Sequence, residues 1–401
     1  MKNNSCFFAA SLLIVLSTST ARLPDWANVA SALAAKHADM AVTTLSTASV
    51  TNALAEIRAA APRYCCFVLR SDEFDAQTCF ALHRMMRELD DDPFHDAIWS
   101  ILSAPTSTDA LRIATSSEPR EIRNILATTG VSQDLATGKV MCFSDAARDA
   151  TPEGDISGIF AQRWNELDPD LIVTSSHATQ FNLEMPFSKG NLFPPASTST
   201  GFRTSAGSAL AAPTREKVWI APGNCLIADN AHTPPQLSPA ASSPALNMAM
   251  TALGWGKVNQ FFGYIKETWY GEIGWGTWHY FSTLRLPLTE SWYTANQNLI
   301  RTLPSTKPKS KDWMGKLWDL DGTVLYGDPA QKIGAARAPL PRWQEGERPL
   351  PIIFEKAAKG RRLISAPEGF EVFVADDFAL VTKWPELSGD WRAKLVFDPA
   401  D

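Results

Sequence analysis

Two residues of this sequence have the types and surroundings that nucleophilic catalysis needs. His177 and Cys225 each follow closely on a short apolar run, Leu171-Ile-Val-Thr-Ser and Lys217-Val-Trp-Ile-Ala, that predicts a buried strand. In an open α/β sheet, side chains just past the carboxyl ends of parallel strands line the crevice where ligands bind. The sequence therefore predicts that an imidazole and a thiol face one cleft.

An imidazole beside a thiol produces a nucleophile at neutral pH. A histidine can take the thiol proton and stabilise the thiolate, which attacks a carbonyl carbon, and the imidazolium then protonates the leaving amine. His177 and Cys225 lie 48 positions apart with the histidine first, close to the spacing of about 50 in cysteine proteases of that order. The pair predicts a Cys/His dyad, although one cysteine after an apolar strand is more often a core residue.

Composition limits the classes of protein to consider. The chain has 401 residues, 45% of them hydrophobic, which is enough for one large core or two smaller ones. The net charge is −6 and no long cluster of lysine and arginine occurs, which argues against nucleic acid as a partner. The sequence contains no Cys-x-x-Cys pair and its six histidines are scattered, so we expect neither a structural zinc site nor a cofactor.

The first 21 residues have the pattern of a secretory signal peptide. A short basic start precedes an apolar stretch, and small residues follow up to Ala21, after which we expect cleavage. The protein would then be secreted, periplasmic or bound at the cell surface. The apolar stretch is shorter than the roughly 20 residues of a membrane span, and no later segment is long and apolar enough to span, so we expect no span in the mature chain. Loss of Cys6 would leave five cysteines, and an odd number leaves at least one free thiol, which suits a nucleophile.

The rest of the chain divides into three regions. Residues 22–61 predict a helical leader or pro-region, residues 62–336 a peptidase-like α/β domain, and residues 337–401 a Pro-rich linker and a small antiparallel β module. Alternating strands and helices predict a mostly parallel sheet with helices on both faces. The expected strands lie at 64–69, 97–104, 139–143, 171–175 and 257–265, and the expected helices at 74–89, 109–114, 119–129, 156–167 and 247–253.

Four segments in this order resemble the gingipain-like cysteine peptidases of the caspase-like clan, in which one apolar strand precedes His-Gly and another precedes the catalytic cysteine. The similarity extends from about Asp90 to Ile333. Asp90-Asp-Asp-Pro-Phe-His-Asp, with Asp109-Ala-Leu downstream, is similar to the family's segment before the catalytic half. Leu325-Tyr-Gly-Asp-Pro-Ala330 is similar to its closing Gly-Asp-Pro signature. The resemblance implies a caspase-like fold, an Ig-like β module after it, and a protein or peptide substrate.

The resemblance also implies roles for particular residues. His177 would act as general base and acid and Cys225 as nucleophile, with an oxyanion hole formed by the backbone N–H groups of Ala178 and Cys225. Ser175, Ser176 and Trp269 would line the pocket for the residue on the acyl side of the scissile bond. Trp269 belongs to a tryptophan-rich stretch that is either a core cluster or a cleft wall, with Trp255, Trp275 and Trp278 as its other members.

The sequence departs from the family pattern in two places. His-Gly is His177-Ala178 here, which retains the N–H group but restricts positive φ. The acidic residue of an arginine-specific pocket has several candidates, Asp145, Asp149, Glu153 and Asp155.

The main interpretation of the sequence is an exported cysteine endopeptidase. The alternatives are a catalytically silent relative that binds peptides or partner proteins, and a cysteine hydrolase that acts on non-peptide amides. The sequence does not indicate an oligomeric state.

Overall fold

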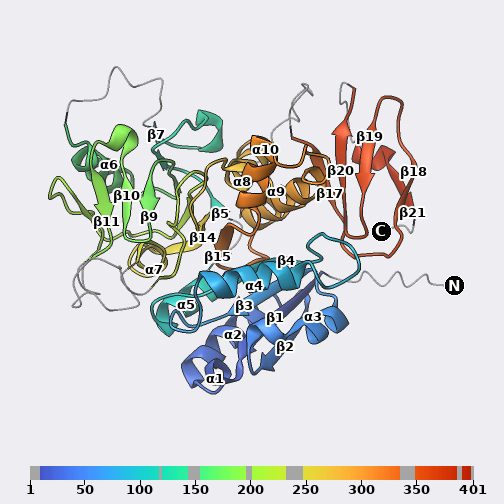
Figure 1. Cartoon of the computed structure of the whole chain (residues 1–401). Helices are drawn as coiled ribbons and strands as arrows, with labels where there is room; N and C mark the ends of the chain where they lie inside the picture. Colours follow the sequence, from blue (N-terminus) through green and yellow to red (C-terminus); the bar gives the residue numbers. More distant parts are fainter. Residues whose placement is uncertain are drawn as a thin grey trace.

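The computed structural model describes residues 10–116, 120–142, 154–195, 201–231, 247–334, 348–385 and 391–398. Within these residues, a mixed α/β fold is built on a ten-stranded sheet (Figure 1). The strands lie in the order β2 (Ala41–Thr47), β1 (Ser11–Ser17), β3 (Tyr64–Val68), β4 (Ile98–Leu102), β15 (Thr323–Tyr326), β14 (Val258–Tyr264), β13 (Lys217–Ile220), β8 (Leu171–Val173), β6 (Ile125–Ala127) and β7 (Val140–Cys142).

The sheet consists of two parallel halves that run in opposite directions. Strands β2, β1, β3, β4 and β15 are parallel to one another. Strands β14, β13, β8, β6 and β7 are also parallel to one another, and the two halves meet at the antiparallel pair of β14 and β15. The carboxyl ends of the strands in the second half therefore share one edge, where a doubly wound sheet places its ligand crevice.

Helices flank this sheet, and several of them begin with a side-chain cap. Asp75 and Thr106 accept hydrogen bonds from the first turns of α4 and α5, which satisfies backbone N–H groups that have no partner within the helix. The helices are α1 (Thr18–Ala21), α2 (Pro24–Lys36), α3 (Leu54–Ala60), α4 (Ala76–Met86), α5 (Ser107–Ala114), α6 (Ser157–Leu167), α7 (Met248–Leu253), α8 (Glu272–Ser282), α9 (Leu288–Thr302) and α10 (Lys311–Asp319). Because helices cover the sheet, its central strands are buried along their whole length.

Most of the predicted elements are confirmed, but the predicted helix at 119–129 is wrong. The structure instead has strand β5 (Arg120–Glu121) and strand β6, with β5 paired to β16 (Ile333–Gly334). Asp170 Oδ2 accepts the backbone N–H groups of Arg123 and Asn124, at 3.0 and 2.9 Å. This contact from a distant part of the chain uses N–H groups that a helix would need, and it leads the chain into the sheet as a strand.

The predicted boundary at Ala21 divides the folded sheet. Strand β1 lies between β2 and β3, and its side chains from Leu12 to Leu16 are at most 2% exposed. Cleavage after Ala21 would remove this strand and separate β2 from β3. Residues 1–9 of the predicted signal peptide lie outside the described residues. Export itself stays a prediction, but residues 11–17 belong to the sheet of this structure.

Residues 22–61 are not a separate helical leader, because they contain strand β2 and contribute to the core. Val29, Leu33 and Ile57 are completely buried. The segment also includes helices α2 and α3 and the 3-10 turn Val50–Asn52. The sheet thus runs without interruption from the predicted leader into the predicted peptidase-like domain, and the two form one unit.

The C-terminal region forms a small β module, as predicted. Its strands are β17 (Leu350–Ile353), β18 (Arg362–Ser365), β19 (Glu371–Val374), β20 (Phe378–Lys383) and β21 (Val396–Asp398), paired antiparallel in the orders β17-β20-β19 and β18-β21. The ring of Phe94, in the loop between α4 and β4, packs against Phe373 and Phe378 with centroids 5.5 and 5.1 Å apart. The module therefore packs onto the main domain. Of the predicted linker, residues 337–347 lie outside the described part of the chain.

A second small sheet lies beside the carboxyl edge of the second half. Its antiparallel strands have the order β12 (Arg203–Thr204), β11 (Asn191–Phe193), β10 (Asn182–Glu184) and β9 (Ala178–Thr179). Strand β9 begins at the residue after His177, so this sheet positions the histidine. Over the described residues, no helix is long and apolar enough to cross a membrane.

Candidate active site

The structure places His177 and Cys225 in loops that leave neighbouring strands at the same edge of the sheet. Strands β8 and β13 are parallel, with Val218 opposite Leu171 and Ile220 opposite Val173. The two loops therefore start side by side. This part of the sequence-based prediction, two chemically active residues after adjacent parallel strands, agrees with the structure.

The loops are also joined beyond the ends of the strands. Asn224 Nδ2 donates a hydrogen bond to the backbone oxygen of Ser176 over 2.8 Å, so the residue before the cysteine is bound to the residue before the histidine. Asn224 is completely buried. The loops also approach closely at Gly223, where a Cβ atom would lie 2.4 Å from Ser175 Oγ. The predicted pocket residues Ser175 and Ser176 thus lie against the segment that leads into Cys225.

The sulfur of Cys225 is held by the segment that follows β14. Cys225 Sγ accepts the backbone N–H of Thr268 at 3.3 Å and lies 3.7 Å from the Thr268 carbonyl oxygen. The cysteine is half-buried. Leu226, the next residue, has φ +55°, a conformation that is strained for a branched side chain and that clusters at functional sites. The thiol therefore has a defined position at a sharp bend of the chain.

Thr268 is itself positioned by Asp319, the last residue of α10, whose buried carboxylate faces the first turn of α8. Asp319 accepts hydrogen bonds from Thr268 Oγ1 at 3.1 Å, from Tyr264 Oη at 3.0 Å and from the backbone N–H of Ile273 at 2.6 Å. A negative charge in the first turn of a helix is favourable. Burial nevertheless raises the pKa of Asp319, against the effect of these donors. Sequence reasoning missed Thr268, Asn224 and Asp319, because each acts through a contact with a distant residue.

His177 lies on the exposed side of this arrangement. Its backbone oxygen accepts the N–H of Glu184 at 2.9 Å, and its side chain is exposed. Among the described residues, no hydrogen bond joins the His177 ring to Cys225 Sγ. The structure therefore brings the two loops together, and the predicted dyad would need the imidazole to come within hydrogen-bond distance of the sulfur. Catalytic contacts are often loose before substrate binds.

The backbone N–H of Ala178, a predicted oxyanion-hole donor, is not used by the strand pairing of its sheet. Because Glu184 donates to His177, the pair Ala178 and Leu183 is a non-hydrogen-bonded position of the antiparallel ladder. Strand β9 is the edge strand of its sheet, so the Ala178 N–H is directed away from β10. In the other loop, the hydrogen bonds of the described residues include none from the N–H of Cys225, whereas Leu226 donates to Lys266.

Trp269 directly follows Thr268, the residue that contacts the cysteine sulfur, and it is 67% exposed. Its ring stacks on that of Trp318 on α10, with centroids 5.8 Å apart and planes at 16°. Trp275 lies deeper, because a Cβ on Gly223 would be 3.5 Å from its ring. Of the tryptophans near the site, Trp318 was not expected, since nothing in the sequence of α10 marks it.

Only one of the four acidic residues considered for an arginine-specific pocket lies among the described residues. Asp145, Asp149 and Glu153 lie outside the described residues. Asp155 accepts hydrogen bonds from Ser157 Oγ and Ser205 Oγ, both at 2.5 Å. Burial acts to raise the pKa of Asp155, but these donors outweigh it and hold the pKa below its ordinary value. Asp155 thus has a structural role at the start of α6.

Three of the other described cysteines are poor candidates for a nucleophile. Cys65, Cys66 and Cys79 are completely buried, and burial raises the pKa of each thiol well above its ordinary value. Cys142 is half-buried on β7, and its Sγ donates to the Thr129 carbonyl at 2.9 Å. All five described cysteines are free thiols, which agrees with an available nucleophile.

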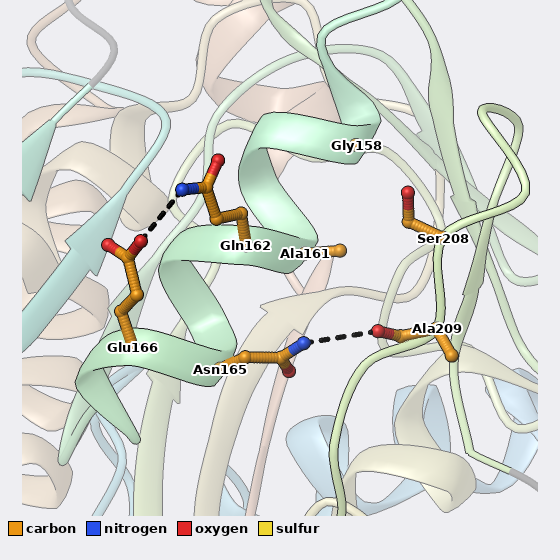
Figure 2. Close-up of a pocket in the computed structure, with 7 residues that line it drawn as sticks. All are labelled: Gly158, Ala161, Gln162, Asn165, Glu166, Ser208 and Ala209. Carbon is orange, nitrogen blue, oxygen red and sulfur yellow. Dashed lines mark hydrogen bonds between the residues drawn. The ribbon is translucent and has the colours of Figure 1, made fainter.

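Figure 2 shows a pocket between α6 and the segment around Ser208. Gln162 donates to Glu166 at 2.7 Å and Asn165 to the Ala209 carbonyl at 3.3 Å along its wall (Figure 2). Its lining contains none of the predicted site residues and no cysteine or histidine.

Two groups of side chains among the described residues have metal-binding spacing. One consists of His83, His95 and Asp321, but Arg87 binds both oxygens of Asp321, which places a positive charge where a cation would lie. The other group is carboxylate only, on the loop between α4 and β4. Neither group lies in the two loops described above.

No protein-family model matches the chain, and no curated protein matches it significantly.

Proposed function

We propose that the protein is a cysteine endopeptidase of the gingipain-like, caspase-like type, in which Cys225 is the nucleophile and His177 the general base and acid. One observation carries the proposal: Asn224 Nδ2 donates to Ser176 O, which holds the cysteine loop against the histidine loop at the carboxyl edge of the sheet. The Ala178 N–H, directed away from β10, and the strained bend at Leu226 support it.

The reaction follows from these groups. His177 takes the thiol proton, and the sulfur of Cys225 attacks the carbonyl carbon of the scissile peptide bond. The N–H groups of Ala178 and Cys225 stabilise the negative oxygen that forms. The imidazolium donates its proton to the leaving nitrogen as the C–N bond breaks, which leaves a thioester. His177 then takes a proton from a water molecule that attacks the thioester, and the acid product and the thiol are released.

We propose that the protein is exported, but that the exported protein still contains strand β1. The N-terminal sequence pattern supports export, while the buried position of Leu12 to Leu16 argues against removal of residues 1–21 from the folded protein. The substrate would be a protein or peptide that reaches the loops around Trp269.

The test is covalent labelling of the full chain with a peptide that carries a thiol-reactive electrophile. We expect a single adduct on Cys225, formed faster than with a small electrophile of the same type that has no peptide. The control is Cys142, the other half-buried thiol. Equal labelling of Cys142 and Cys225, or no peptide-dependent increase in rate, would count against a peptidase.

A catalytically silent peptide-binding protein is the second candidate. The observation that favours it is the exposed His177 ring, which makes no hydrogen bond to Cys225 Sγ. Such a protein would bind the peptide reversibly without cleaving it. Cleavage of a peptide library by the wild-type chain, lost in Cys225→Ala, would exclude this candidate.

A further inference from the structure

Large apolar side chains are exposed together on helix α10 and on the loop that follows β14. Five of the eight large apolar side chains that are exposed among the described residues belong to these two short segments. Helix α10 packs beside α8 (Figure 1). We call these five residues the α10 surface: Trp269, Tyr270, Met314, Leu317 and Trp318. The last three are spaced three and four positions apart, so they share one face of the helix.

Contacts between the loop and the helix hold the aromatic rings of this surface in place. The Trp269 ring stacks on Trp318, and Trp318 Nε1 donates to the backbone oxygen of Glu267 at 2.8 Å. The Tyr270 ring lies against the backbone of α10 at Gly315, where a Cβ atom would be 2.5 Å from the ring. Rings that are already ordered lose little conformational freedom when a partner binds. A fixed, exposed apolar patch of this kind is typical of an interaction site.

The α10 surface is accompanied by positive charge, although the net charge of the whole chain is −6. Residues 307–318 include four lysines and a single acidic residue, Asp312, which accepts a hydrogen bond from the Tyr270 hydroxyl. Three of these lysines are exposed and form no ion pair with a described residue: Lys307, Lys309 and Lys311. Apolar rings beside lysines without an acidic partner are complementary to a molecule that combines apolar and acidic groups.

This surface begins next to the proposed nucleophile. The backbone N–H of Thr268 donates to Cys225 Sγ at 3.3 Å, and the next residue is Trp269. A peptide whose scissile bond lies at Cys225 therefore reaches the α10 surface with residues that neighbour this bond in its sequence. This continuity favours the substrate as the occupant over a separate partner such as a lipid membrane.

We propose that the α10 surface binds a segment of the protein substrate in which an aromatic or other large apolar side chain stands next to acidic residues. The inference rests on the proposed function, because it takes the occupant to be the substrate. The apolar side chain packs on Trp269 and Trp318, and the acidic residues pair with the exposed lysines. A basic segment is repelled by the same lysines, so the surface selects among substrates. It extends beyond the pocket predicted for the residue on the acyl side, to which only Trp269 of the five residues belongs.

The test is fluorescence anisotropy of labelled peptides with the full chain that carries Cys225→Ala, which can bind a peptide without cleaving it. The probe is a peptide that contains tryptophan and several glutamates, and the comparison peptide has lysine in place of each glutamate. We expect saturable binding of the acidic peptide, weaker at high salt, and at least about tenfold weaker binding of the lysine peptide.

Two further substitutions in this chain test the surface itself. Leu317→Ala should weaken binding of the acidic peptide by about five- to tenfold, because it removes apolar contact area. Leu23→Ala is the matched control, since Leu23 is 40% exposed and Leu317 is 44% exposed. Lys311→Glu should weaken binding by about tenfold or more. Lys332→Glu is its control, because it makes the same change of net charge at an exposed lysine outside α10.

Several results would overturn the proposal. They are the absence of saturable binding below roughly 1 mM peptide, equal affinity for the two peptides, and equal losses of affinity in Leu317→Ala and Leu23→Ala. Sedimentation with vesicles of phosphatidylcholine and phosphatidylserine tests the membrane alternative. Vesicle binding that is lost in Leu317→Ala, with no binding of the acidic peptide, would replace the substrate by a lipid surface and so refute the inference.

Cleavage assays separate this inference from the peptidase proposal. Binding of the acidic peptide that is weakened in Leu317→Ala, without cleavage by the wild-type chain, would support the α10 surface and count against the peptidase. Cleavage of the acidic peptide with equal kcat/KM in the wild type, Leu317→Ala and Lys311→Glu would refute the α10 surface and leave the peptidase proposal standing.

Discussion

His37 Nε2 lies 2.7 Å from Asp328 Oδ2, and Lys36 Nζ lies at the same distance from that oxygen. Asp328 is completely buried in the Gly-Asp-Pro turn that follows β15. Burial acts to raise the pKa of Asp328, but the hydrogen bond from His37 and the charges of Lys36 and His37 outweigh it and hold the pKa below its ordinary value. The contact joins the end of α2 to the opposite end of the chain's α/β domain, which explains why residues 22–61 are part of that domain.

His37→Ala should lower the free energy of unfolding by about 1–3 kcal/mol, because it leaves a buried carboxylate with one partner fewer. Urea denaturation at pH 7 measures the change. Lys359→Ala removes an ion pair in which both side chains are at least 85% exposed, and it should have no measurable effect. Equal stability of His37→Ala and the wild type would show that the contact is unimportant.

Deletion of residues 1–21 should prevent folding. Each of the buried side chains from Leu12 to Leu16 contributes about 1.5–3 kcal/mol on burial, and a whole domain is stable by only about 5–15 kcal/mol. Near-UV circular dichroism and cooperative thermal unfolding of the purified deletion variant test this. A cooperatively folded variant would instead support removal of the segment as a signal peptide.

Cys225→Ala and His177→Ala should each reduce peptide cleavage to the same background, and the double variant should be little worse, because residues that act as one unit are not additive. The measurement is kcat/KM on a cleaved peptide. Cys142→Ala should leave kcat/KM unchanged. Full activity of Cys225→Ala would remove the assignment of the nucleophile.

Asn224→Asp should reduce kcat by about 100-fold with a smaller change in KM, since loss of the donor to Ser176 lets the two loops separate and small displacements of catalytic groups are costly. Asn165→Asp is a matched control, because Asn165 also donates to a backbone oxygen but lies at the pocket of Figure 2. Steady-state kinetics and the thermal midpoint of both variants separate a positioning effect from general destabilisation. A similar loss of kcat in the two variants would contradict the role given to Asn224.

The Asp377 carboxyl should make stability depend on pH. Its pKa is about 7 in the folded chain, above the ordinary value, so the folded state binds this proton more tightly than the unfolded state does. The stabilisation is complete below a pH of about 4 and is lost as the pH rises through 7. The free energy of unfolding should fall between pH 5 and 8 by on the order of 2–4 kcal/mol through this group. Asp377→Asn should show a smaller fall in the same denaturation series.

The sequence by itself determined much of the local structure. Apolar runs such as Leu171-Ile-Val and Lys217-Val-Trp-Ile predict strands because a buried strand needs largely continuous apolar side chains. His177 and Cys225 stand out in the sequence because each follows closely on such a run. The segment from Leu12 to Leu16 shows the limit of this reasoning. A short apolar run is common to a signal peptide and a buried strand, and only its pairing with β2 and β3 distinguishes them.

The tertiary structure alone decided which distant residues meet. Strand order, the reversed direction of β15 against β14, and the contacts of Asn224 with Ser176 and of Thr268 with Cys225 all join segments far apart in the chain. No local pattern encodes such contacts, because they depend on how whole elements pack.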